Sequence, residues 1–234
     1  MKPISRRKLL AGVASCGVAS VVGLTVFTSG SRAFPETTRL QTDSIEGIML
    51  DWRETYNGTI LTDTTDGTAT GSPTGPAISL GNVLPGDSGS LSVRLRLDTE
   101  EEGAGDLEVE TAIQFEMTGD LQSPGLQEFI SAAVWYDTGL FGVEAFGRNN
   151  GERDPGEQLV HPDAEGTIED VTNALSDGVT LDTTPTSPFE APCLSGTDEV
   201  TVTFGWWFPP DQENINAVQG DSVDFDIRFD AERC

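Results

Sequence analysis

The 234-residue sequence has very little histidine, and this scarcity argues against several kinds of enzyme. Its one histidine, His161, precludes the H-E-x-x-H motif, in which two histidines of a helix bind the zinc ion of a peptidase. A serine hydrolase would need His161 as its base, yet no serine stands in a G-x-S-x-G motif. Carboxylate pairs of the kind that glycosidases use are too frequent in so acidic a chain to mark a site. We therefore expect no enzyme activity, and we interpret His161 as a surface residue.

Lysine is missing altogether after residue 33, and the charge balance there is extreme. Residues 34–234 hold all 39 Asp and Glu but only 8 Arg, which leaves 31 net negative charges. Molar salt shortens the Debye length to about 3 Å and so screens the mutual repulsion of these carboxylates. We therefore expect an extracellular protein of a salt-loving organism. Nucleic acid is disfavoured as a partner, since the chain has no basic patch that could displace counterions.

Long apolar runs are also missing, with one exception close to the N-terminus. Residues 9–27 are apolar or small and follow the basic pair Arg6-Arg7. A short segment with small residues, Ser31-Arg32-Ala33, comes after them and suits a cleavage site. This layout is typical of a cleavable export signal. The arginine pair resembles that of twin-arginine signals, which direct folded chains to a dedicated export machinery. We predict a signal peptide at residues 1–33.

Cleavage by a signal peptidase between Ala33 and Phe34 would release residues 34–234 as a secreted or cell-surface protein. That length suits a single domain. The apolar run could instead serve as a permanent membrane anchor, because about 18 residues are enough to span a bilayer. A third interpretation is lipid attachment at Cys16, although the apolar run continues well beyond that residue.

Cysteine is scarce as well. Cys16 lies in the predicted signal, and only Cys193 and Cys234 remain after it. Two thiols in an exported domain indicate one disulfide, which would tie the C-terminus to an earlier loop. The alternative is a pair of free thiols.

Strand patterns dominate the predicted secreted part. Apolar-face residues alternate with polar ones in two long segments, at Leu107, Val109, Thr111, Ile113, Phe115 and Met117, and at Val223, Phe225, Ile227 and Phe229. One face of each strand is thus apolar and the other charged, which predicts a mainly β fold, an antiparallel β-sandwich. Residues 124–136 and 166–175 break the alternation, and we predict two short helices there, in the connections. In the second, Thr167 is a candidate N-cap with Asp170 three residues on.

Two short motifs indicate features at the edges and surface of the sheets. Asn57-Gly58 favours a tight hairpin turn, and with Thr59 it forms a sequon for glycosylation of Asn57 in an exported chain. Trp206 and Trp207 are adjacent in a predicted strand, so their side chains point to opposite faces. We expect at most one of the two in the core, which leaves the other to cover an edge or contact a partner.

The segment from Asp137 to Glu157 is the one candidate for a metal site. Its hard oxygen ligands are interspersed with glycines, which suits a calcium loop; the candidate ligands are Asp137, Asn149, Asn150, Glu152 and Asp154. The regular D-x-D-x-D-G spacing is absent, however. We favour an acidic loop adapted to salt, with no cofactor.

Several motifs occur in an informative order: an export signal followed by "AF", then "TDSIEGIMLDW", "LGNVLPGDSGSLSVRLRL" and "VTFGWWFPP...NINAVQGDSVDFDIRFDAERC". In this order and spacing the chain resembles, over nearly its whole length, the TasA/camelysin family of secreted matrix-fibre proteins. The version it resembles is the one with twin-arginine signals found in salt-loving archaea. The stretch "FPETTRLQTDS" departs from the family, which more usually has two aromatic residues and then an acidic turn.

The resemblance implies a jelly-roll sandwich that assembles with copies of itself. Each subunit would donate an N-terminal strand to an unpaired sheet edge of the next, and because head-to-tail donation does not close, it yields filaments of an extracellular matrix or biofilm. The donor would be residues 34–44, with Phe34 and Leu40 among its contacts.

Two alternatives to a fibre subunit stay open. One is a monomeric cell-surface module that binds calcium or polysaccharide through the segment from Asp137 to Glu157 or through an exposed tryptophan. The other is a camelysin-like metallopeptidase, which the resemblance suggests but for which the chain offers one histidine and no ligand motif.

Overall fold

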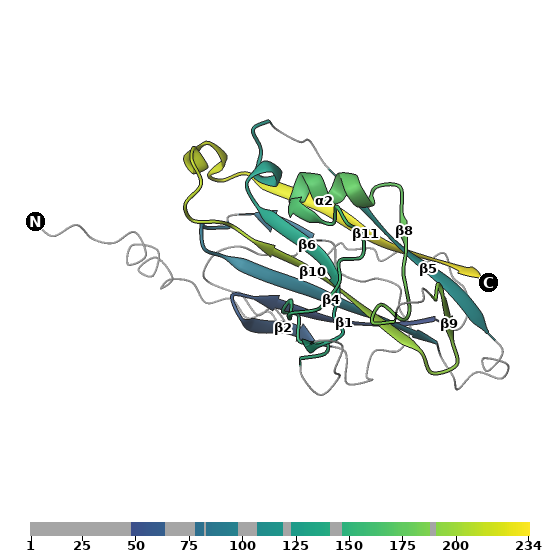
Figure 1. Cartoon of the computed structure of the whole chain (residues 1–234). Coiled ribbons are helices and arrows are strands. Elements are labelled where there is room, and N and C mark those ends of the chain that lie inside the picture. Colours follow the sequence, from purple (N-terminus) through teal and green to yellow (C-terminus); the bar gives the residue numbers. More distant parts are fainter. Residues whose placement is uncertain are drawn as a thin grey trace, which may run out of the picture.

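The computed structural model describes residues 48–63, 78–81, 83–97, 107–118, 123–140, 147–187 and 191–234. Within these ranges the chain is mainly β and forms two antiparallel sheets, as the alternation predicted (Figure 1). The predicted signal at 1–33, with Arg6, Arg7 and the cleavage point between Ala33 and Phe34, lies outside the described residues, as does the predicted donor 34–44 with Leu40. No helix of the described ranges is both long and apolar enough to cross a membrane.

The larger sheet has six strands. Their order across the sheet is β2 (Thr59–Asp63), β1 (Ile48–Tyr56), β4 (Ser88–Leu97), β10 (Glu199–Trp207), β6 (Ser131–Tyr136) and β7 (Glu165–Thr167). The hairpin from β1 to β2 turns at Asn57-Gly58, as predicted. Both residues have positive φ, 47° and 74°, which this tight turn requires and which Asn and Gly tolerate best.

The second sheet has five strands and includes the longest strand of the described chain. The order is β3 (Ile78–Gly81), β11 (Ser222–Arg233), β5 (Glu108–Thr118) and β8 (Val179–Thr180), with β9 (Cys193–Ser195) also paired to β5. The two predicted alternating segments became β5 and β11, which pair with each other from Asp224 to Arg233 of β11.

The two sheets pack face to face through one apolar core. Val223, Phe225, Ile227 and Phe229 of β11 are all buried, and the residues between them are more exposed. Phe204 of β10 contacts both Phe225 and Phe115 of the other sheet, with ring centroids 5.1 and 5.6 Å apart. Period-two alternation therefore sorts these strands into a core face and a solvent face.

The two predicted helices have different outcomes. Residues 168–175 form α2 (Ile168–Leu175), which begins with the predicted cap: Thr167 Oγ1 accepts from the Asp170 N–H (3.1 Å), and Asp170 accepts from the Thr167 N–H (2.9 Å). The prediction over 124–136 is wrong. That segment has only a single 3-10 turn, η2 (Leu126–Glu128), followed by the strand β6; a further turn, η4 (Ile215–Val218), precedes β11.

The misassigned segment lacks alternation because both of its faces are covered. Ala132, Ala133, Val134, Trp135 and Tyr136 are all buried, since β6 lies inside the six-stranded sheet and is covered on its outer side as well. A continuous apolar run of this length fits a buried strand and a buried helix equally well, so periodicity could not separate the two.

Candidate functional site

The outer face of the six-stranded sheet gathers most of the residues that the sequence singled out. Along β10, Val200, Val202, Phe204 and Trp206 face the core, so Thr201, Thr203, Gly205 and Trp207 face outward. The two tryptophans lie on opposite faces, as predicted: Trp206 is 3% exposed and Trp207 is 40% exposed. The outward side of this sheet is therefore where loops or ligands can lie.

A loop comprising residues 147–157 folds over part of this outer face, and Asp137 at the end of β6 holds it there. Oδ1 of Asp137 accepts from the Asn149 N–H (2.6 Å), and Oδ2 accepts from the Gly151 N–H (2.9 Å) and from the Thr203 hydroxyl (3.1 Å). From β1, Arg53 donates to the Asn149 carbonyl (2.9 Å). We call residues 147–157 the anchored loop.

Gly151 lets the anchored loop approach the sheet closely. Its φ is +76°, which favours glycine, and a Cβ placed there would lie 2.7 Å from Oγ of Ser90 on β4. The loop therefore rests directly on the strand, and the polar outer side of β4 is buried at this point: Ser90 is 5% exposed and Ser92 is 4% exposed.

A second buried carboxylate, Glu157, closes the end of the anchored loop. Its Oε1 accepts from the Gly139 N–H (2.7 Å) and its Oε2 accepts from the Asp154 N–H (2.8 Å). Burial raises the pKa of both Asp137 and Glu157, because removal from water disfavours the charged form more than the N–H donors favour it. The negative charge of Asp137 raises the pKa of Glu157 further.

These contacts change the interpretation of the predicted calcium ligands. Asp137 accepts backbone N–H groups, the side-chain Oδ1 of Asn150 accepts from the Glu152 N–H (2.6 Å), and Asp154 accepts from the Asn150 side-chain amide (3.0 Å). Glu152 is exposed. Oxygens that already accept from N–H donors tie the loop to itself and to the sheet. In the described part of the chain, no group of three or more His, Cys, Asp or Glu is placed to hold a metal ion.

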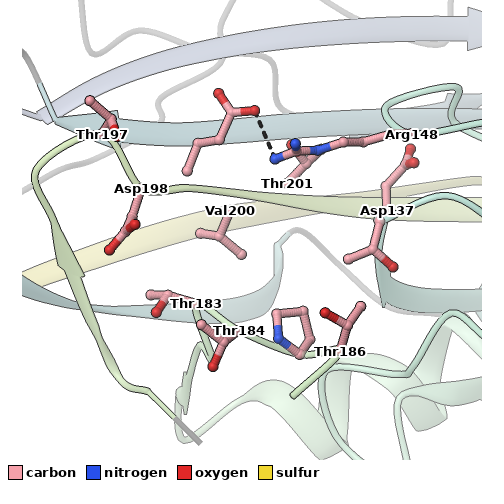
Figure 2. A pocket seen from close by; sticks show the side chains of 12 residues that line it. Asp137, Arg148, Thr183, Thr184, Thr186, Thr197, Asp198, Val200 and Thr201 are labelled. Atoms are coloured by element: carbon pink, nitrogen blue, oxygen red, sulfur yellow. Dashed lines mark ion pairs between the residues drawn. The ribbon is translucent and has the colours of Figure 1, made fainter. Parts of the chain in front are cut away.

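A polar pocket of about 360 Å³ opens beside Arg148, near the start of the anchored loop (Figure 2). Threonine hydroxyls line it, together with an ion pair between Arg148 of the loop and Glu199 at the start of β10 (2.8 Å); the threonines are Thr138, Thr183, Thr184, Thr186, Thr197 and Thr201. Asp137 reaches this pocket from β6, as Figure 2 shows.

A second depression, of about 340 Å³, lies on the other side of the anchored loop, and we call it the tryptophan groove. Its lining includes Trp207 and Trp135, the loop residues Glu152 and Arg153, and Glu165 of β7. Arg153 and Glu165 form an ion pair of 2.9 Å at the rim. The exposed tryptophan and the acidic loop, which the sequence presented as separate features, thus border one groove.

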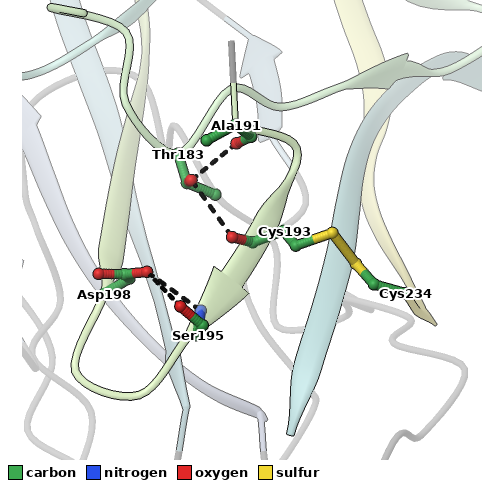
Figure 3. Close-up of a disulfide and its surroundings, with 6 residues drawn as sticks. All are labelled: Thr183, Ala191, Cys193, Ser195, Asp198 and Cys234. Carbon is green, nitrogen blue, oxygen red and sulfur yellow. Dashed lines mark hydrogen bonds between the residues drawn. A yellow bond between two sulfur atoms is a disulfide. The ribbon is translucent and has the colours of Figure 1, made fainter. Parts of the chain in front are cut away.

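The remaining predicted residues that the structure describes line neither the polar pocket nor the tryptophan groove. Cys193 and Cys234 form a disulfide with an S–S distance of 2.02 Å, which joins the start of β9 to the residue after β11 (Figure 3). Asn57 is exposed at its turn, where its amide donates to Asp87 (3.0 Å) and its carbonyl oxygen accepts from the Ser88 N–H (2.9 Å). His161 is half-buried, and its Nδ1 accepts from the Asp163 N–H (3.2 Å).

Comparison with known proteins gave no assignment: no protein-family model matches the chain, and no curated protein matches it.

Proposed function

We propose that this chain is a secreted structural subunit that forms extracellular fibres or surface filaments by β-strand pairing between copies. The observation that carries the proposal is the character of β2, one of the two edge strands of the six-stranded sheet in the described part of the chain. Its Ile60 is 48% exposed and its Leu61 is 39% exposed. An edge strand with exposed aliphatic side chains offers both backbone hydrogen-bonding groups and apolar surface to an incoming strand.

The incoming strand in this proposal is residues 34–44 of a neighbouring copy, with Phe34 and Leu40 among its apolar side chains. Residues 34–44 come shortly before β1 in the chain, so each copy would carry both a donor and an acceptor. Donation from one copy to the next is heterologous, and it builds an open filament where the rotation between successive copies does not close a ring.

The order of strands supports a jelly-roll-like version of the sandwich. The chain passes from one sheet to the other at seven connections: β2 to β3, β3 to β4, β4 to β5, β5 to β6, β7 to β8, β9 to β10 and β10 to β11. Repeated crossing of this kind is how a jelly roll winds its two sheets, and it agrees with the architecture that the sequence resemblance implies.

The proposal is tested by electron microscopy of the secreted protein, residues 34–234, in molar salt. We expect filaments from the intact chain and monomers after deletion of residues 34–44. The double variant Ile60→Lys, Leu61→Lys should also give monomers, because two ammonium groups at the acceptor edge oppose strand addition. Leu84→Lys is the matched control: Leu84 is 52% exposed in a turn outside β2, so this variant should still form filaments.

Binding of a donor peptide tests the acceptor edge separately from the donor segment. A chain that lacks residues 34–44 keeps its β2 edge, so it should bind a synthetic peptide of residues 34–44, whereas the Ile60→Lys, Leu61→Lys chain should not. Monomers of the intact secreted chain under these conditions, or equal peptide binding by both variants, would contradict the proposal.

A further inference from the structure

The tryptophan groove presents a flat aromatic surface on a rigid support. Trp207 pairs with Ser88 of β4 on one side and with Ser131 of β6 on the other, so its backbone is held within the sheet. Its side chain is nevertheless 40% exposed, although a ring of this size gains much from burial. A large, accessible indole on a backbone held in this way can bind a ligand with little loss of conformational entropy.

Gly205 makes room for the ring of Trp135 on the outer face of the sheet. Gly205, two residues before Trp207, has no side chain, and a Cβ placed there would lie 2.5 Å from the ring of Trp135. The Trp135 indole therefore lies over Gly205 and forms a wall of the groove next to Trp207. Its volume of about 340 Å³ is within the range of small-ligand sites, about 300–1,000 Å³.

Polar groups stand around this aromatic surface. Glu152 is exposed on the anchored loop, and Arg153 pairs with Glu165 across the rim (2.9 Å) while both side chains stay partly accessible. Carboxylate oxygens accept hydrogen bonds from hydroxyl groups, and a guanidinium donates to hydroxyl oxygens. An apolar face surrounded by such donors and acceptors matches a ligand with one C–H-rich face and a periphery of hydroxyls.

We propose that the tryptophan groove binds a hexose unit of a neutral polysaccharide. The C–H bonds on one face of a pyranose ring carry partial positive charge and would pack on the negative π face of Trp207. The equatorial hydroxyls would then reach Glu152 and the Arg153–Glu165 pair. A neutral polymer is favoured over an acidic one, because the groove itself presents two carboxylates, Glu152 and Glu165, against the single guanidinium of Arg153. This activity needs one copy only, so it does not rest on filament formation.

The test is isothermal titration calorimetry of the secreted chain in molar salt with three soluble neutral polymers, an α-1,4-glucan, a β-1,3-glucan and a β-1,4-mannan, and with a polyuronate for comparison. We expect at least one neutral polymer to bind. Trp207→Ala should weaken that binding by about tenfold or more, as the loss of a central aromatic contact does, and Trp207→Phe should restore part of it.

Leu84→Ala is the control for loss of an exposed apolar side chain outside the groove, and it should leave the affinity unchanged. The urea midpoint of Trp207→Ala checks that the fold is intact. The proposal is overturned if no neutral polymer binds, if Trp207→Ala binds as tightly as the parent chain, or if only the polyuronate binds. It is also overturned if sedimentation shows that Trp207→Ala impairs self-association and not polysaccharide binding, since the groove would then be a contact between copies.

Discussion

Replacing Asp137 with asparagine should free the anchored loop from the sheet. The carboxylate uses one oxygen for the Asn149 N–H (2.6 Å) and the other for the Gly151 N–H (2.9 Å), whereas an asparagine offers only one carbonyl oxygen. Its NH₂ group would face one of these two donors. Leaving a buried donor without an acceptor costs about 1–3 kcal/mol. We expect the free energy of unfolding to fall by about 1–3 kcal/mol.

The loss is measured by urea unfolding in molar salt, with tryptophan fluorescence as the probe. Amide hydrogen exchange at Asn149 and Gly151 shows whether the loop opens separately from the sheet. The matched control is Asp154→Asn in the same loop, because Asp154 is half-buried and its carboxylate accepts from the Asn150 amide (3.0 Å). That variant should cost less than about 1 kcal/mol.

The dependence on pH tests the role of burial. Burial raises the pKa of Asp137 in the folded protein above its ordinary value of 3.8, so the folded state binds this proton more tightly than the unfolded state does. The associated stability is fully present below pH 3.8 and is lost as the pH rises through the raised pKa. The difference in unfolding free energy between the parent chain and Asp137→Asn should therefore shrink as the pH rises. A difference that grows with pH, or equal stability of the two chains, would refute this account of Asp137.

Two further predictions concern the disulfide and calcium. The double variant Cys193→Ser, Cys234→Ser should lose about 4 kcal/mol of unfolding free energy, because the bond closes a loop of 41 residues. Urea unfolding checks this, and a reducing agent should destabilise the parent chain equally while leaving the variant unchanged. Millimolar calcium should shift the midpoint of thermal unfolding by less than about 1 °C, because Asp137 and Glu157 already accept from N–H donors. A larger increase that Asp154→Ala abolishes would instead support the calcium-loop interpretation.

The sequence predicted those elements whose cause is local. The hairpin at Asn57-Gly58 follows from residues that tolerate positive φ, and α2 begins where Thr167 and Asp170 can cap each other. Strand β11 was evident because one of its faces meets the core and the other meets solvent. Strand β6 was not evident, because a strand covered on both faces leaves no alternation in the sequence.

The candidate site was less accessible to prediction because backbone groups make its contacts. Two partners of Asp137 are the N–H groups of residues 12 and 14 positions later in the chain, and any residue type other than proline provides such a donor; the third, the Thr203 hydroxyl, lies 66 positions away. The only sequence signal for this role of Asp137 was its position directly after the apolar run of β6. The composition of the segment suggested metal ligation, since acceptors for a cation and acceptors for N–H groups are the same atoms.

The two proposals involve different parts of the six-stranded sheet, its edge at β2 and its outer face, so strand addition and polysaccharide binding can occur together. Ile60 of the proposed acceptor edge lies opposite Thr55 of β1, and Thr55 also lines the tryptophan groove. A strand added at β2 extends the sheet in its plane, whereas a sugar ring on Trp207 would lie on its outer face, so filament growth leaves the groove open. A filament would then carry one groove per subunit, and several weak contacts along one polymer chain would combine into tight attachment. It follows that the double variant Ile60→Lys, Leu61→Lys should lose the tight attachment of a filament to the polysaccharide, while each single copy keeps its own affinity. Trp207→Ala should instead lose the affinity for the polysaccharide while filaments persist.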